Sequence, residues 1–150
     1  MWQRIQTVFL ALAIAALLSG LILPIWSAET GGQSAVLTAF YFKQGEAYQY
    51  NPYMLTAILA IASATLAIIA ITKYKSRFTQ MKIGALNSLF MAGTIGSAVY
   101  FASQLIKAHE TGGQYGLGLW LPGVAVICNL LANRFIRRDE KLVRDSDRLR

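Results

Sequence analysis

The sequence predicts an all-α membrane protein: a four-helix transmembrane bundle with a short extracytoplasmic β-hairpin in its first loop and a cytoplasmic C-terminal helical extension. Three observations support this fold class. Hydrophobic residues make up 55% of the 150-residue chain, and the mean hydropathy is +0.45. Charged residues are absent from four long apolar runs, at residues 7–23, 54–72, 83–101 and 117–132. Runs of about twenty apolar residues can cross a bilayer as helices, so we expect a single integral membrane domain over residues 1–150.

The formal net charge of +7 has a simple explanation in a membrane protein. Cytoplasmic loops carry an excess of Lys and Arg, so we expect the lipid bilayer, and not nucleic acid, as the partner of this chain. The cysteine and histidine contents are equally restrictive. Cys128, the only cysteine, lies in an apolar run and cannot form an intrachain disulfide, and His109 is the only histidine. We therefore expect no metal centre and no cofactor.

The first apolar run is expected to stay in the protein as a membrane span. Residues 7–23 are long for the apolar part of a signal peptide, and Trp26 lies where cleavage requires a small residue. Pro24 closes the helix, and Trp26 is predicted to anchor it at the membrane interface.

Residues 25–53 form the longest polar interruption, and they are rich in aromatic residues. The segments VLTAFYF and AYQY surround a turn at Gly45, which predicts a short β-hairpin on the membrane surface. Its aromatic rings form either an interfacial belt at headgroup depth or a platform for a ligand or partner. Asn51 and Pro52 match the N-cap and the first position of the next helix.

The third apolar run carries small side chains at helical spacing. They lie on one ridge at every fourth residue and on the ridge beside it: Gly84, Ser88, Ala92 and Gly96, with Gly93 and Ser97. Helices associate within lipid through close van der Waals contact, which small residues permit. We expect this ladder to be the face against which the other spans pack.

The fourth run follows a glycine-rich segment, residues 112–118, that we interpret as a flexible entry to the helix. The tail after it, residues 133–150, keeps helical character, because Phe135, Leu142 and Leu149 repeat every seven residues along a charged helix. Four arginines of the tail are candidate interaction residues: Arg137, Arg138, Arg144 and Arg148. Either anionic lipid headgroups or a protein could bind them, and the tail could also pack against the basic loop at 73–82.

The distribution of basic residues predicts the topology. Twelve of them fall on one side of the predicted spans: Arg4, the four of the 73–82 loop, and seven in the tail. Only Lys43 and Lys107 fall on the other side. By the excess of Lys and Arg in cytoplasmic loops, both termini of this multi-pass protein should lie in the cytoplasm.

The four apolar runs contain no Asp, Glu, Lys, Arg or His, whereas proton-coupled transporters and intramembrane enzymes usually carry such a residue at membrane depth. The strongest polar groups there are Asn87 and Asn129, each about one turn from the cytoplasmic end of its helix. They predict an interhelical hydrogen bond or, alternatively, a polar cavity for a small ligand. We interpret His109, beside Glu110, as a solvated loop residue.

The opening MWQRIQTVFLALA and the closing IRRDEKLVRDSDRLR, with four spans between them, resemble a family of small membrane proteins of Bacteroidota, domain of unknown function 4293. The resemblance covers the full length. It implies a four-span protein of the bacterial inner membrane and brings no activity, cofactor or substrate. In topology alone the chain is also similar to the claudin group, although it lacks that group's paired outer-loop cysteines.

The function we expect from the sequence is that of a non-enzymatic accessory or scaffold protein. It would act through helix contacts and the basic tail, with a membrane-protein partner or a second copy of the chain. The alternative is a small-molecule or lipid-binding or transport protein with a cavity among the spans, reached between Asn87 and Asn129. An enzyme would need converging titratable groups at one membrane face, and we see no base or nucleophile beside the basic clusters.

Overall fold

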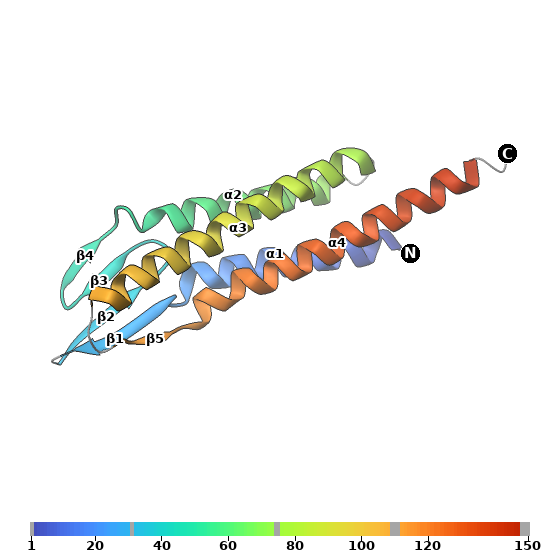
Figure 1. Ribbon diagram of the computed structural model, residues 1–150. Helices are drawn as coiled ribbons and strands as arrows, with labels where there is room; N and C mark the ends of the chain where they lie inside the picture. The colour runs from blue at the N-terminus through green and yellow to red at the C-terminus, as the bar shows by residue number, and fades with distance from the viewer. Residues whose placement is uncertain (1, 31, 74–75, 109–111, 148–150) are drawn as a thin grey trace.

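The computed structural model describes residues 2–30, 32–73, 76–108 and 112–147. Four long helices pack side by side and antiparallel in it (Figure 1): α1 (Trp2–Ile22), α2 (Met54–Thr72), α3 (Arg77–Ala108) and α4 (Leu117–Asp147). All four are long and apolar enough to cross a membrane. The predicted four-span bundle is confirmed, and the chain is a multi-pass membrane protein.

Small residues fill the centre of the bundle and large aliphatic residues cover its outside. Helix α1 packs against α2 and α4, and α3 packs against the same two helices. One buried cluster takes residues from all four helices, among them Ala13, Ala64, Met91 and Ala125. The exposed large side chains, such as Leu89 and Ile127, lie on the outer surface. This arrangement suits a lipid surround, because close backbone contact and not apolar burial drives helix association there.

A five-stranded antiparallel sheet covers one end of the bundle. Its strands are β1 (Trp26–Thr30), β2 (Gln33–Leu37), β3 (Phe42–Gln44), β4 (Ala47–Gln49) and β5 (Gln114–Tyr115), in the order β4-β3-β2-β1-β5. The predicted hairpin around Gly45 is the β3–β4 pair, and the sheet is larger than that prediction. Strand β5 comes from the link between α3 and α4, so it ties the second loop on this side to the first (Figure 1).

The predicted strand VLTAFYF is interrupted by a turn. Strand β2 ends at Leu37, and the backbone N–H of Thr38 donates to the carbonyl of Tyr41 at 2.9 Å. The Thr38 hydroxyl also donates to the Tyr41 carbonyl and accepts from the Tyr41 N–H, at 3.0 and 3.2 Å. A threonine side chain can replace a ladder contact in this way, which is why strand propensity alone did not locate the turn.

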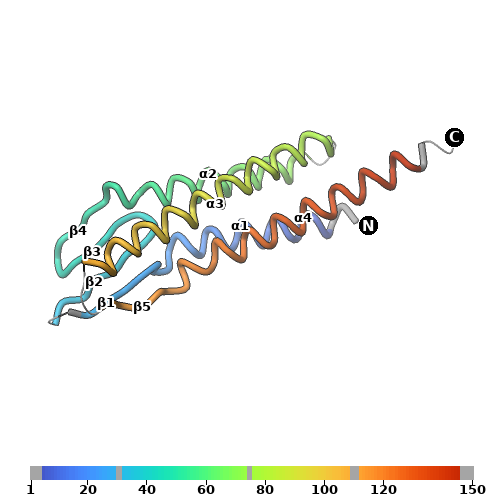
Figure 2. The backbone as a smooth tube through the Cα atoms, in the orientation of Figure 1, coloured from blue at the N-terminus to red at the C-terminus, as the bar shows by residue number. Residues whose placement is uncertain are grey.

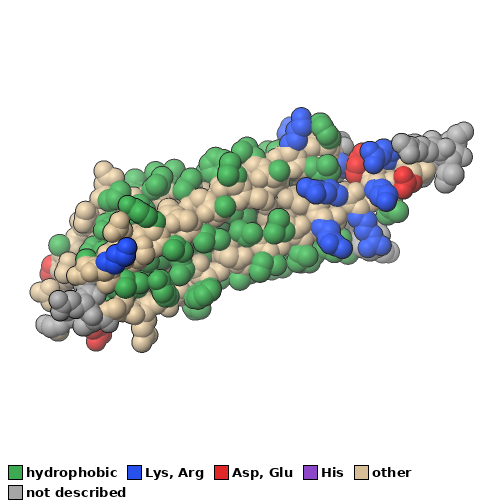
Figure 3. Space-filling view, viewed as in Figure 1, with side chains coloured by type: hydrophobic (Ala, Val, Ile, Leu, Met, Phe, Trp, Pro, Cys, Tyr) green, Lys and Arg blue, Asp and Glu red, His purple; other side chains and the backbone are tan. Residues whose placement is uncertain are grey.

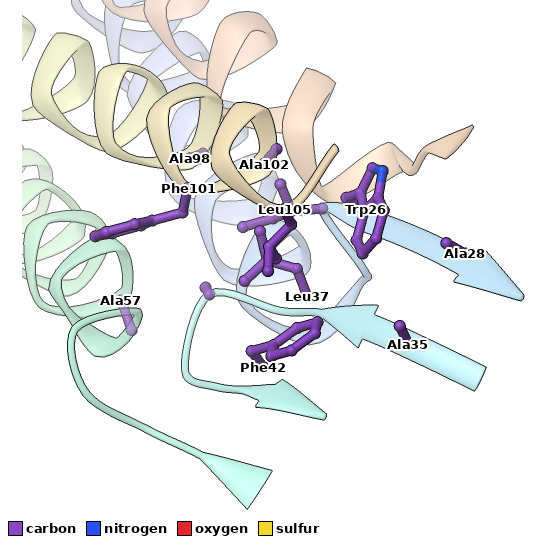
Figure 4. Packing of buried hydrophobic residues seen from close by; sticks show 12 residues of the cluster. Trp26, Ala28, Ala35, Leu37, Phe42, Ala57, Ala98, Phe101, Ala102 and Leu105 are labelled. Carbon is purple, nitrogen blue, oxygen red and sulfur yellow. The ribbon is translucent and has the colours of Figure 1, made fainter. Parts of the chain in front are cut away.

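The sheet packs on the bundle through a continuous apolar cluster (Figure 4). Trp26, Leu37 and Phe42 of the sheet face Phe101 and Leu105 of α3. Trp26 is 0% exposed, and its Nε1–H donates to the carbonyl of Gly112 at 3.1 Å. The prediction that Trp26 anchors the first span at the membrane interface is therefore wrong, because the ring lies inside the protein.

The start of α2 also differs from the prediction. The N-cap is Tyr53, whose side chain makes no capping hydrogen bond, and Asn51 and Pro52 lie in a turn before it, around a cis peptide bond. Backbone groups of the turn serve instead, since the N–H of Met54 donates to the carbonyl of Tyr50 at 2.9 Å. The Tyr53 ring packs edge-on against Phe101, with ring centroids 5.2 Å apart.

The glycine-rich segment before α4 is held closely, and the interpretation of it as a flexible entry is wrong. The N–H of Gly116 donates to the carbonyl of Ile25, and the N–H of Gly118 donates to the carbonyl of Pro24, both at 2.9 Å. A β-carbon at either glycine would overlap the backbone of Pro24. These glycines are needed because the start of α4 approaches the end of α1 backbone to backbone.

Helix α4 continues from the span into the tail without a break, as predicted, and runs beyond the end of the bundle (Figure 2). The two chain ends lie at the same end of the molecule, opposite the sheet. Most Lys and Arg side chains visible in Figure 3 gather at this end.

Candidate functional site

A polar network of three helices lies inside the bundle. The Ser63 hydroxyl of α2 donates to Asn87 Oδ1 of α3 at 2.6 Å, and Asn87 Nδ2 donates to Asn129 Oδ1 of α4 at 3.3 Å. Asn129 Nδ2 in turn donates to Ser88 Oγ at 2.9 Å and to the carbonyl of Gly84 at 3.0 Å. The structure thus brings together the two asparagines that the sequence singled out.

The two asparagines at which the alternative hypothesis places a cavity form hydrogen bonds to each other and to neighbouring groups. Asn87 and Asn129 are 1% and 0% exposed, and the side-chain amide of each one is hydrogen-bonded. Ser63 was missed in the sequence, although it is a polar residue in an apolar run one turn from buried alanines. The arrangement can hold helices together in lipid, where an interhelical hydrogen bond contributes about 0.6 to 2 kcal/mol.

We expect Asn87→Ala and Asn129→Ala to be coupled in their effect on the free energy of unfolding. Each single variant removes the amide–amide hydrogen bond and leaves its partner buried, so the double variant should cost less than the sum by about 0.6 to 2 kcal/mol. Detergent-induced unfolding of the four proteins measures this coupling. The exposed Thr65, changed to Ala in combination with Asn129→Ala, is the additive control. Additivity for the asparagine pair would contradict the network.

The predicted small-residue ladder is divided between two neighbours and the outer surface. Gly84 and Ser88 lie against α4 through Asn129. Gly93 and Ser97, from the second ridge, face α2, where Ser97 Oγ lies 3.0 Å from Thr56 Oγ1. Ala92 and Gly96 are exposed, and no atom lies within 4 Å of a β-carbon built on Gly96. The expectation of one packing face is therefore wrong for these two residues.

The geometry of the α-helix explains this division. Each residue turns the helix by about 100°, so a step of four residues overshoots a full turn by about 40°. Three such steps rotate the ladder by about 120°, from the α4 interface to the outside. The buried face of α3 instead alternates steps of three and four residues, through Asn87, Met91, Thr94 and Ala98.

A second polar contact fixes the base of the tail. The guanidinium of Arg77, at the start of α3, forms an ion pair with the Asp139 carboxylate at 3.1 Å and donates to the Asp139 carbonyl, also at 3.1 Å. The packing of the tail against the 73–82 loop, expected from the sequence as one of several outcomes, is present here. Arg137, Arg138 and Arg144 lie on the exposed surface of α4 on either side of Asp139 in the sequence. Arg148 lies outside the described residues.

On the sheet, aromatic rings contact one another and a lysine. Tyr41 packs edge-on against Tyr48 and Tyr50, with centroids 5.3 and 5.9 Å apart, and Lys43 Nζ lies 5.2 Å from the centroid of the Tyr48 ring. The hydrogen bond to Tyr48 is the main cause that raises the pKa of Lys43. Burial raises the pKa of Tyr53. Both shifts favour the protonated form and supply no base near neutral pH.

Among the residues that the structure describes, no group of three or more His, Cys, Asp or Glu side chains is placed to hold a metal ion. Cys128 is a buried free thiol. His109 and Glu110, interpreted above as solvated, lie outside the described part of the chain.

Comparison with known proteins gives one family. A family model described as a domain of unknown function (DUF4293) matches residues 2–149. No curated protein matches the chain, and no solved structure matches it.

Proposed function

Since the chain belongs to the family described as a domain of unknown function (DUF4293), a description that assigns no activity, we propose from the structure that it is a non-enzymatic accessory or scaffold protein of the bacterial inner membrane. It acts by presenting the end of α4 to a protein partner. The satisfied network around Asn87 and Asn129 supports a structural role for the bundle. The burial of both residues and the hydrogen bond between them do not favour a small-molecule site there.

The observation that carries this proposal is that the tail projects from the bundle as a continuous helix. Helix α4 extends to Asp147, and the Arg77–Asp139 contact fixes it where it leaves the bundle. The first apolar residue of the predicted stripe, Phe135, packs within the protein, where its ring stacks on Phe9 with centroids 5.6 Å apart. Leu142 lies beyond this contact and is 54% exposed. A fixed helix with an exposed leucine presents a constant surface at little cost in conformational entropy.

The proposed partner is an amphipathic protein helix with acidic residues beside its apolar face. The tail from residue 134 onward has seven basic and four acidic residues, which gives it a net charge of +3. Helix pairs of this kind bury an apolar stripe and match charges along its edges.

We propose that both termini lie in the cytoplasm, so that the partner is cytoplasmic or has a cytoplasmic segment. The support is the excess of basic residues at the end that carries both termini and the α2–α3 loop. Lys43 and Lys107 lie in the sheet and at the end of α3, on the opposite side.

Site-specific photocrosslinking in cells that produce the protein tests this function. We expect a photoreactive residue at Leu142 to give one protein adduct of defined mass, and the same residue at Leu89, on the lipid-facing surface, to give no such adduct. The adduct should be absent when position 142 keeps its leucine and the photoreactive residue replaces Tyr48 in the sheet. Absence of any protein adduct at position 142 would contradict the proposed role of the tail.

A further inference from the structure

A groove runs along the outer surface between α3 and α4, beside the polar network, with which it shares Ser88. It has a volume of about 700 Å³. The α3 wall is made of the small residues Ala85 and Ser88, and the α4 wall is made of larger apolar residues followed by polar ones: Ile127, Leu130, Leu131, Asn133, Arg134 and Arg137. The groove exists because the α3 side chains are too short to fill the space beside the leucines.

The groove is about as long as one lipid leaflet is thick, and its wall changes from apolar to cationic in the same direction as a phospholipid does from acyl chain to headgroup. From Ile127 to Arg137 the helix rises about 15 Å, which is about half the thickness of the hydrocarbon core. The apolar wall lies toward the middle of the span, and the two arginines lie past its predicted end at residue 132. An acyl chain and a headgroup would meet apolar and cationic surface in the same order.

The charges at this end of the groove favour an anion. Arg137 and Arg138 are three and four residues after Arg134, so each lies near Arg134 on the helix surface. Like charges at this spacing repel each other, and a phosphate between Arg134 and Arg137 would relieve the repulsion while accepting charge-assisted hydrogen bonds.

One amide in the wall of the groove packs against α3. Asn133 is 8% exposed and lines the groove. Its Oδ1 is buried without a hydrogen-bond partner among the described residues, although nearly all buried polar groups have one. The amide packs directly over Gly84, where a β-carbon would overlap it. Asn133 therefore closes the groove on its α3 side, with its buried Oδ1 turned toward Gly84.

We propose that this groove binds one anionic phospholipid molecule, with its phosphate between Arg134 and Arg137 and an acyl chain along Ala85, Leu130 and Leu131. The phospholipid is favoured over free phosphate because most of the groove wall is apolar. This site does not depend on the proposed role of the tail, since Leu142 lies outside it.

Native mass spectrometry of the delipidated full chain in detergent tests the site. Titration with phosphatidylglycerol should give one tightly retained lipid, and phosphatidylcholine should be retained at least about fivefold less. Two changes should each weaken retention of phosphatidylglycerol by about tenfold: Arg134→Gln with Arg137→Gln, which removes the charges, and Ala85→Leu, which fills the groove. Near-UV circular dichroism confirms that each variant is folded.

Matched controls separate this site from general attraction to a positive tail. Lys141→Gln with Arg144→Gln removes two charges from the same helix outside the groove, and Ala92→Leu adds the same bulk to an exposed position of α3. Both should change retention less than about twofold. Equal loss in the two charge variants, unchanged retention in Ala85→Leu, or full competition by inorganic phosphate would overturn the proposal.

Discussion

Replacing Trp26 by alanine should lower the free energy of unfolding by about 3 to 5 kcal/mol, the range measured for large aromatic residues in protein cores. The ring is fully buried between the sheet and α3. It also joins two loops that are far apart in sequence, because its Nε1–H donates to the carbonyl of Gly112. The variant would lose both the packing of the cluster and this contact. Unfolding in mixed detergent micelles, followed by tryptophan-independent far-UV circular dichroism, measures the loss.

Trp120 is the matched control for this prediction. It is 64% exposed on the first turn of α4, so Trp120→Ala should change the unfolding free energy by less than about 1 kcal/mol. Trp26→Phe should fall between wild type and Trp26→Ala, because it keeps an aromatic ring and loses the donor to Gly112. Similar effects of the two alanine variants would show that Trp26 is not part of a core.

Gly118→Ala should destabilise the protein by about 2 to 4 kcal/mol. A β-carbon there would overlap the carbonyl oxygen of Leu23 and lie 2.8 Å from that of Pro24, and backbone atoms cannot move aside as the end of a side chain can. The Pro24 carbonyl also accepts the Gly118 N–H, so separating the two helices would lengthen this hydrogen bond. The same unfolding measurement gives the cost.

Gly123→Ala, in the same helix, is the control for the backbone contact. No atom lies within 4 Å of a β-carbon built on Gly123, so alanine should be neutral or stabilise by up to about 1 kcal/mol through its helix propensity. A loss for Gly123→Ala as large as for Gly118→Ala would mean that both effects arise from the chain entering α4 and not from contact with α1.

The helices could be predicted from the sequence because the signals for them are long and local. An uncharged run of about nineteen residues has few alternatives to a membrane span, and the tail carried its seven-residue repeat beyond the span. Asn87 and Asn129 could be paired because each is a strong polar group at a similar depth in its own run, where lipid leaves it no other partner.

The sheet and its core depended on contacts that no local pattern reveals. Strand β5 has only two residues, and it pairs with Trp26 and Ser27, which lie more than 80 residues earlier in the chain. Trp26 is a residue type common at membrane interfaces, and it is buried here because the sheet, α3 and residues 112–115 pack around it. Likewise the four-residue repeat from Gly84 to Gly96 shows that successive small residues are neighbours on the helix surface. It does not show which of them face another helix.

The pairing of β5 with β1 also sets an order on biogenesis. Strand β1 is synthesised directly after the first span, whereas its partner β5 follows the third, so one edge of β1 stays open until most of the chain has been translated. The sheet can therefore close only after the third span has been made, and a nascent chain arrested before β5 carries an exposed strand edge that quality-control proteases or chaperones can recognise.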